Sequence, residues 1–251
     1  MNISPIQSLW IGKSLSALEC LSINSFLKHG HEFHLYCFEE VANIPPGVTV
    51  KEARHILPPE KIFKYREYDS YAGFSNLFRY KLLLEKGGYW ADLDVVCLRP
   101  FDTEDDYVFP SERTMDINGY TICNCIIKAP PASAIMEYCF TTAASCDPNL
   151  LKWGETGPGL VMSAVERFEL HAFVSSPDVY CPVDFWSWRQ LFVEENENSM
   201  DSMILPNTKA IHFWNEMLRR ENVNKNGEFP PDCVFEQLKL RYPLSHNTRN
   251  G

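Results

Sequence analysis

The sequence predicts an α/β fold in a single domain over residues 1–251, and three observations carry this prediction. Residues 6–12 and 32–38 have the apolar composition of short strands, and residues 15–30 between them place Leu and Phe at helical spacing. This strand–helix–strand order is typical of a parallel βαβ unit. A second helix and strand follow at residues 71–98, and a chain of 251 residues is long enough to bury one large core.

Glycines mark where the two predicted helices of the N-terminal half end. Gly30 fits a left-handed C-cap, and Gly87–Gly88 stops the second helix before an apolar run. The strands that the pattern predicts are 6–12, 32–38, 48–50, 89–98, 106–111, 120–129 and 210–214. The predicted helices are 15–30, 71–86, 132–145 and 160–170, and residues from about 240 to 251 are expected to form a flexible tail.

Composition excludes several classes of protein. The net charge of −10 argues against broad nucleic-acid binding, and there is no run of 18 apolar residues that would predict a transmembrane helix. The N-terminus lacks the basic and apolar regions of a signal peptide, so we expect a cytoplasmic protein. Nine cysteines without a Cys-x-x-Cys pair argue against zinc ribbons and fingers, and we expect reduced thiols that pack as small hydrophobic groups.

Asp92 and Asp94 stand one residue apart in the otherwise apolar run 89–98. In a strand, residues i and i+2 point to the same face, so the two carboxylates would converge and repel each other. A hard divalent cation such as Mg²⁺ or Mn²⁺ relieves that repulsion and keeps coordination positions open for phosphate oxygens. The alternative is an exposed strand end with ordinary surface acids, as the similar acidic pair Glu104-x-Asp106 is expected to be.

The helix before this pair carries polar residues on one face. Ser75, Asn76 and Arg79 lie at spacings that let the guanidinium share a face with both polar side chains. The fixed fork of donors on Arg79 suits a phosphate or sugar hydroxyls. The alternative for Arg79 is a salt bridge with Glu85 or another acid.

Residues 72–96, AGFSNLFRYKLLLEKGGYWADLDVV, resemble the DxD region of glycosyltransferase family 32, the group of the yeast initiating mannosyltransferase and α-1,4-galactosyltransferases. They resemble the clostridial glucosylating toxins more distantly. The residues that match the family pattern are Ser75, Arg79, Tyr80, Gly87, Gly88, Asp92 and Asp94. Two positions depart from it: Asn76 replaces the usual Asp that contacts donor-sugar hydroxyls, and Trp90 replaces the usual Tyr.

Three other stretches are similar to the same family. Residues 8–12 match its first strand, whose Trp packs on the nucleotide base, and residues 156–159 match its Thr-Gly-Pro loop beside the donor. Residues 210–217 match its late His-x-Trp-Asn segment, in which His212 or Asn215 would reach the metal and diphosphate. Each stretch also has a plain structural interpretation, as a core tryptophan, a turn before a helix, or a packed histidine.

The resemblance implies a GT-A type, Rossmann-like nucleotide-sugar-binding domain with a mixed central sheet. It implies transfer of a hexose, galactose or glucose ahead of mannose, with retention at the anomeric carbon. The cofactors would be Mn²⁺ or Mg²⁺ and a nucleotide-sugar, with a UDP-sugar favoured. The implied catalytic residues are Asp92, Asp94 and Arg79, and the implied metal ligands are Asp92, Asp94, His212 and Asn215. The implied nucleotide-sugar contacts are Trp10, Ile11, Gly12, Ser75, Asn76, Arg79, Trp90, Asp92, Thr156, Gly157, Pro158, His212 and Trp214.

Several alternatives stay open from the sequence. These are a GDP-mannose-using mannosyltransferase, an effector that glycosylates a protein, and a sugar-binding protein without activity. The expected acceptor is a glycan or a lipid-linked oligosaccharide, in polysaccharide or cell-envelope glycan synthesis. Basic residues of the C-terminal third, Lys225 among them, can form a peripheral contact with the inner membrane face or a mixed solvated surface. The sequence assigns no catalytic base, although Glu155 and Asp116 are candidates, and no oligomeric state.

Overall fold

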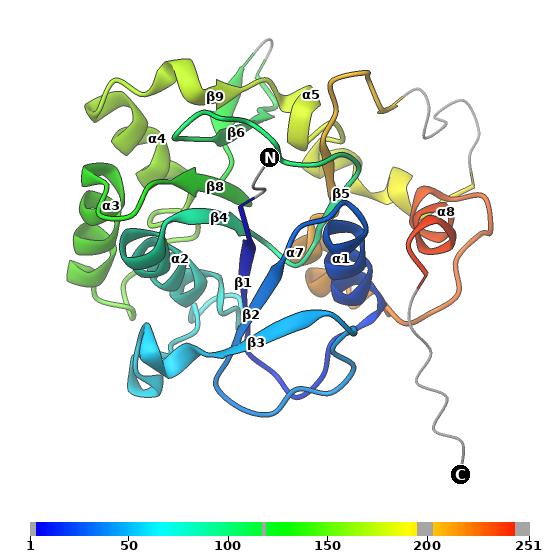
Figure 1. Cartoon of the computed structure of the whole chain (residues 1–251), viewed down its shortest axis with the longest axis horizontal. Helices are drawn as coiled ribbons and strands as arrows, with labels where there is room; N and C mark the ends of the chain where they lie inside the picture. The colour runs from blue at the N-terminus through cyan, green and yellow to red at the C-terminus, as the bar shows by residue number, and fades with distance from the viewer. Residues whose placement is uncertain (1–3, 117–118, 195–202, 244–251) are drawn as a thin grey trace.

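A five-stranded sheet in the order β3-β2-β1-β4-β8 forms the centre of the structure (Figure 1). The structure is a computed structural model, and it describes residues 4–116, 119–194 and 203–243. Strands β1 to β4 are parallel to their neighbours, and β8 pairs with β4 in the antiparallel sense. The predicted α/β fold with a mixed central sheet is therefore confirmed. The predicted parallel βαβ unit is also confirmed. Strands β1 and β2 are parallel and pair over five residues, and one helix connects them in the sequence.

The strands are β1 Ile6–Trp10, β2 Phe33–Cys37, β3 Val48–Glu52, β4 Gly88–Ala91, β5 Val95–Cys97, β6 Phe109–Arg113, β7 Tyr120–Ile122, β8 Ile126–Ala129, β9 Val174–Ser175 and β10 Ala210–His212. The α-helices are α1 Ala17–Lys28, α2 Ala72–Lys86, α3 Ala134–Ser145, α4 Pro158–Arg167, α5 Pro177–Tyr180, α7 Asn215–Arg220 and α8 Val234–Arg241. Within the described residues, the 3₁₀ helices are η1 Ala53–His55, η2 Pro59–Lys61, η3 His171–Phe173 and η4 Phe185–Leu191.

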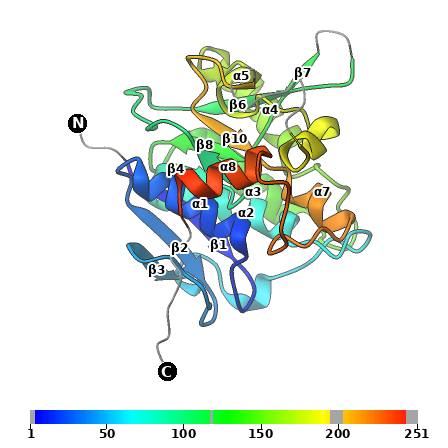
Figure 2. The ribbon, with the colours of Figure 1, turned by 90° about the vertical axis from the view of Figure 1, so that its right-hand side faces the viewer.

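Helices cover the central sheet on both faces, with α1 on one side and α2 and α3 on the other (Figure 1). Strand β4 is buried on both faces, because Tyr89 and Ala91 pack with the α1 side while Trp90 packs with the α2 side. Burial on both faces explains why the strand is apolar without alternation. Helix α8 lies next to α1, as Figure 2 shows, and the Asn24 amide donates to the carbonyl of Pro243. Among the described residues, no helix is long and apolar enough to cross a bilayer.

Two segments that were predicted as single strands are each divided between two sheets. Residues 89–98 form β4 in the central sheet and β5, which pairs with β10; the chain turns at 92–94, where Val95 N–H donates to Asp92 O. The prediction of one strand there was wrong, and so was the argument that Asp92 and Asp94 share a strand face. Residues 120–129 are likewise divided into β7 and β8. Polar residues stand at both breaks, but apolar residues continue the strand pattern on either side of them, so the local pattern does not show that the two halves join different sheets.

The order of the strands creates a switch point beside β1. The chain runs outward from β1 to β2 and β3, and then returns to β4 on the other side of β1. In open α/β sheets, ligands bind outside the carboxyl ends of the strands at such a point. The carboxyl ends of β1 and β4 are Trp10 and Ala91, and Ala91 immediately precedes Asp92.

At the C-terminal end of the chain, α8 continues to Arg241, and residues 244–251 of the expected flexible tail lie outside the described residues.

The glycine that ends α2 generates a stability prediction. Gly87 has φ of +62°, and a Cβ there would lie 2.5 Å from the backbone nitrogen of Pro131. We expect Gly87→Ala to lower the free energy of unfolding by more than about 2 kcal/mol, because it adds a clash with backbone to the left-handed strain. Gly30 is the matched control: its φ is +83°, but no atom of a described residue beyond its chain neighbours lies within 4 Å of a built Cβ. Gly30→Ala should lower the free energy of unfolding, measured in urea, by only about 1 kcal/mol. Equal losses of stability in the two variants would contradict the clash at residue 87.

Candidate active site

The acidic pair lies on the turn that leaves the central sheet at the switch point. Backbone hydrogen bonds hold this turn on both sides: Asp92 N–H donates to Cys125 O over 2.7 Å, and Phe213 N–H donates to Asp94 O over 2.8 Å. The turn, rather than strand alternation, therefore places the two carboxylates near each other. The C-terminal part of the chain reaches them because β10 pairs with β5 and aligns His212 with Val95.

Asp92 has its own set of partners on α2 and β4. Its Oδ1 lies 3.0 Å from Nη2 of Arg79 and accepts a hydrogen bond of 2.8 Å from Nε1 of Trp90. The guanidinium also stacks over the Trp90 ring, with its carbon 4.8 Å from the ring centroid. Trp90 is only 1% exposed. In the structure, Trp90 therefore orients the Asp92 carboxylate from inside the core.

The donors of Arg79 are mostly used within the protein. Nη1 donates to the carbonyl oxygen of Asn124, and Nη2 also donates to Oγ of Ser75 over 3.2 Å. Arg79 is buried, and the acid that it pairs with is Asp92 rather than Glu85, which pairs with Lys81 instead. Arg79 is thus placed to position Asp92.

Asp94 is held by the other half of the site. Its Oδ2 accepts a hydrogen bond of 2.7 Å from the backbone N–H of Asn215 and lies 3.2 Å from Nε2 of His212. The Trp214 ring packs on the imidazole with a centroid distance of 4.0 Å, and its Nε1 donates to Val183 O. The sequence segment 212–215 therefore reaches the acidic pair, and its contacts are with the carboxylate of Asp94.

The two carboxyl groups differ in their electrostatics. Burial raises the pKa of Asp92 above its ordinary value; Arg79 opposes this shift, and the charge of Asp94 adds to it. Burial alone would raise the pKa of Asp94 as well, but His212 and the Asn215 N–H hold it below its ordinary value. The partners that the protein supplies to Asp92 therefore do not fully offset the effect of burial on its carboxylate.

This donor set fits a hard divalent cation. Two carboxylates on one turn offer oxygen ligands, and a cation nearby would stabilise the ionised form of Asp92 against burial. The side-chain oxygen of Asn215 accepts a hydrogen bond of 3.0 Å from Lys225. Asp92 and Asp94 are accordingly the residues that can hold Mg²⁺ or Mn²⁺, with Arg79, Trp90 and His212 orienting them.

Lys225 links Asn215 to the end of β1, because its Nζ donates to the side-chain oxygen of Asn215 and lies over the ring of Trp10. The Trp10 ring is half-buried at the end of β1, and Nζ of Lys225 lies 5.8 Å from its centroid. Lys225 also pairs with Glu19, which is 1% exposed and caps the start of α1 by accepting from Ser16 N–H. The sequence did not single out Lys225 as a site residue, because nothing in its local pattern distinguishes it from surface lysines.

The loop before α4 packs against the polar face of α2. Tyr80 OH donates to Thr156 O over 2.9 Å, and a Cβ on Gly157 would lie 3.0 Å from Nδ2 of Asn76. Glycine at this position thus allows the close approach. Asn76 accepts a hydrogen bond of 2.8 Å from Asn124, a residue that the sequence pattern does not mark because it lies inside an apolar run.

Three further residues were expected to contact the nucleotide-sugar. Ile11 packs on the α2 side of the core, Gly12 follows it, and Pro158 is the first residue of α4.

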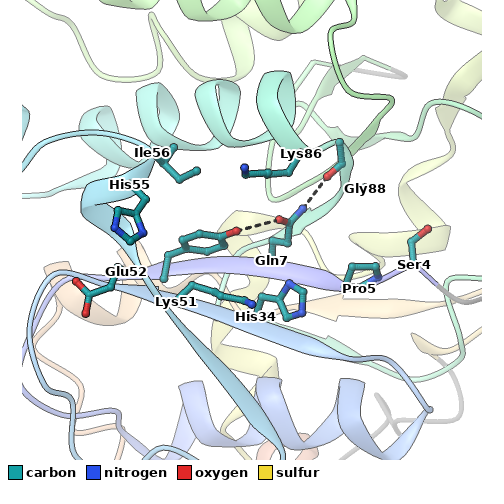
Figure 3. A pocket seen from close by; sticks show the side chains of 12 residues that line it. Ser4, Pro5, Gln7, His34, Lys51, Glu52, His55, Ile56, Lys86 and Gly88 are labelled. Atoms are coloured by element: carbon teal, nitrogen blue, oxygen red, sulfur yellow. Dashed lines mark hydrogen bonds between the residues drawn. The ribbon is translucent and has the colours of Figure 1, made fainter.

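Two hollows lie outside the acidic turn. One of about 630 Å³ is lined by residues of β1, β2, β3 and the end of α2; Gln7 bridges Tyr36 and Gly87 within it (Figure 3). Neither Asp92 nor Asp94 lines that hollow. A second hollow of about 400 Å³ lies between residues 65–68 and 149–153. Its Trp153 is 39% exposed and packs against Tyr65 and Tyr68.

Two family models match successive parts of the sequence. Residues 20–114 match "Glycosyltransferase sugar-binding region containing DXD motif", and residues 147–238 match "Alpha 1,4-glycosyltransferase conserved region". The first match includes Arg79 and the acidic pair, and the second includes the loop before α4 and His212. No curated protein matches the sequence significantly.

Solved structures of glycosyltransferases show a distant likeness. PaToxG glycosyltransferase is 16% identical, with 66% of this chain and 68% of that chain covered at a TM-score of 0.49. The galactosyltransferase LgtC, solved in complex with donor and acceptor sugar analogs, is 9% identical, with 90% and 97% covered at a TM-score of 0.47.

The buried Arg79–Asp92 pair generates a second prediction. Arg79→Met should lower the free energy of unfolding by about 3 kcal/mol, because it leaves the Asp92 carboxylate without its cation in a largely buried position. Adding Asp92→Asn should recover part of this loss, as a double-mutant cycle in urea unfolding will measure. Lys81→Met on the same helix is the control; it removes a pair with Glu85 in which both side chains are partly exposed, whereas Arg79 is buried, and it should cost less than about 1 kcal/mol. Losses that simply add in the double variant would disprove the coupling.

Proposed function

Because both matched families are glycosyltransferases, the chain is a glycosyltransferase with a DXD motif, and we propose that it transfers galactose or glucose from a UDP-sugar to a hydroxyl of a glycan. The observation that carries the proposal is the position of Asp92 and Asp94 at the switch point, outside the carboxyl ends of β1 and β4. The resemblance to glycosyltransferases that the sequence indicated is confirmed by the two family models, and so is the expectation of an enzyme.

In the proposed reaction, Asp92 and Asp94 would hold a divalent cation, which would supply positive charge for the departing nucleoside diphosphate. Arg79 and Trp90 fix the Asp92 carboxylate, while His212 and the Asn215 N–H fix that of Asp94. Holding the two carboxylates in place before the donor arrives avoids a cost of reorganisation during the reaction. We assign Arg79 as a positioning residue for this reason.

Trp10 and Lys225 are the residues that we propose for the nucleotide. A half-buried indole at the end of β1 offers a flat face for a uracil base. Lys225 lies between this ring and Asn215, where its charge can meet a phosphate oxygen of the donor. Asn76, held by Asn124, is the proposed contact for the donor sugar. The choice of UDP over GDP rests on the resemblance of residues 8–12 to UDP-using relatives.

We propose transfer with retention and without a protein nucleophile. Of the two acids considered for a base, Glu155 accepts a hydrogen bond from Lys152 N–H in an exposed loop, and Asp116 is exposed. Departure of the diphosphate and positioning of the acceptor hydroxyl are then the main demands on the site. A role in polysaccharide or cell-envelope glycan synthesis in the cytoplasm rests on the sequence alone.

The hollow beside Trp153 is the acceptor site that we propose. It lies next to the Thr156–Gly157 loop, which is anchored on α2 near Arg79. An exposed indole with Tyr65 and Tyr68 beside it offers the flat apolar faces on which sugar rings pack, and Arg220 lies 4.8 Å from the Trp153 centroid. These features favour a glycan as acceptor.

The third prediction tests donor and metal together. With Mn²⁺ present, UDP should raise the melting temperature of the protein more than GDP, and UDP-galactose or UDP-glucose should be hydrolysed slowly without an acceptor. Asp92→Asn should reduce this hydrolysis by at least about 100-fold, because the cation loses a ligand. The control is Glu104→Gln/Asp106→Asn, an exposed acidic pair of the same spacing, which should leave the rate unchanged. Hydrolysis of GDP-mannose alone would reject the donor, and the absence of any nucleotide effect in wild type would reject the proposed function.

The fourth prediction concerns the acceptor hollow. Trp153→Ala should raise the KM for a disaccharide acceptor such as lactose about tenfold, because a stacking face is lost. Hydrolysis of the donor without acceptor should stay at the wild-type rate. Tyr120→Ala removes another exposed aromatic ring, 66% exposed, on β7 and should change neither quantity. A Trp153→Ala enzyme with an unchanged acceptor KM for every acceptor that wild type uses would place the acceptor elsewhere.

A further inference from the structure

Three cysteines and a histidine form a buried cluster behind the acidic turn. Cys123, Cys125, Cys181 and His212 are all buried, and one ligand atom of each lies within 4.8 Å of those of the others. They come from three segments: the connection between β7 and β8, the residue after α5, and the end of β10. Packing of thiols as small hydrophobic groups does not require three of them and an imidazole nitrogen to converge on one point.

The backbone fixes the positions of these residues. Cys123 N–H donates to Pro110 O over 2.9 Å, and Cys125 O accepts from Asp92 N–H. Cys181 N–H donates to Pro177 O over 2.8 Å and closes α5. His212 is held by the pairing of β10 with β5. The cluster is therefore built into the junction between the sheets.

The two nitrogens of His212 have different surroundings. Nε2 lies 3.2 Å from Oδ2 of Asp94, whereas Nδ1 is buried and has no hydrogen-bond partner among the described residues. A buried nitrogen without a partner is unfavourable and calls for a ligand. A histidine that binds a metal through one nitrogen and donates from the other to a carboxylate has this arrangement.

The distance between two of the sulfurs also fits a metal. Sγ of Cys125 and Sγ of Cys181 are 3.8 Å apart. Four ligands arranged tetrahedrally around zinc, with Zn–S distances of about 2.3 Å, place two sulfurs about 3.8 Å apart. A disulfide would need the two sulfurs at about 2.0 Å.

From these contacts we propose that Cys123, Cys125, Cys181 and Nδ1 of His212 bind one Zn²⁺ ion in a closed structural site. Binding replaces the protons of the three thiols, which are released to solvent, and uses the lone pair of Nδ1 while Nε2–H donates to Asp94. Thiolate ligands select zinc over Mn²⁺ or Mg²⁺, so this ion is distinct from the cation proposed at Asp92 and Asp94. The zinc would tie three segments together and fix the imidazole that orients Asp94.

The first measurement is the metal content of tag-free protein, expressed with added zinc and purified under reducing conditions. Elemental analysis should find about one zinc per chain, retained on dialysis against buffer without metal. Protein produced with Co²⁺ in place of zinc should show the visible absorption of tetrahedral cobalt bound to thiolates. Neither measurement uses a nucleotide-sugar, so failure here is distinguishable from failure of the proposed function.

Variants then locate the ion. Cys125→Ser and Cys181→Ser should each lose most of the zinc, because serine is a poor ligand for it. Cys139→Ser is the matched control, since Cys139 is a buried free thiol on α3 outside the cluster, and it should keep the full content. Asp92→Asn should also keep the zinc, because Asp92 is not one of the four ligands.

Three results would overturn the proposal. Wild-type protein without zinc or cobalt signal would do so, and this outcome does not depend on whether any variant folds. Full zinc content in both Cys125→Ser and Cys181→Ser would place the ion elsewhere. Detection of a Cys125–Cys181 disulfide by mass spectrometry, in protein alkylated before purification, would show that the sulfurs serve as a covalent link instead.

Discussion

Burial of two neighbouring carboxylates on one turn is the constraint on which the rest of the site depends. Asp92 and Asp94 repel each other, and each is removed from most of the water that would stabilise its charge. The protein meets this cost with separate partners for each acid. Arg79 and Trp90 come from the segment just before the turn, whereas His212 and Asn215 come from about 120 residues later in the chain.

The two acids obtain partners from distant segments because the chain passes from one sheet to another at the acidic turn. At Ala91 the chain leaves the central sheet, and β5 then pairs with β10, so the late segment is brought beside the early one. The crossing from β7 to β8 lies against the same turn through the hydrogen bond from Asp92 to Cys125. The turn is therefore the place where the N-terminal, middle and C-terminal parts of the chain meet. A zinc ion in the cysteine–histidine cluster would hold that junction from behind.

Much of the site could be predicted from the sequence because its signals are local. The parallel unit at the N-terminus, the helix that carries Arg79 and the glycines after it each follow from spacing within one short segment. The DXD pattern and the late His-x-Trp-Asn segment could likewise be selected, and the structure brings both to one turn. The sequence could not identify Lys225, Asn124 or the cysteine cluster as parts of the site. Their partners lie in other segments of the chain, and the residues next to them in the sequence form no recognisable motif.

By itself, the sequence determined the α/β class, the acidic pair and the family of enzymes to which its motifs belong. Only the tertiary structure decided that the pair lies on a turn between two sheets, that Arg79 pairs with Asp92, and that Nε2 of His212 lies beside Asp94. The reason is physical. Apolar periodicity records whether a residue is buried, but the two halves of residues 89–98 are buried in different sheets, and only strand pairing between distant segments distinguishes them.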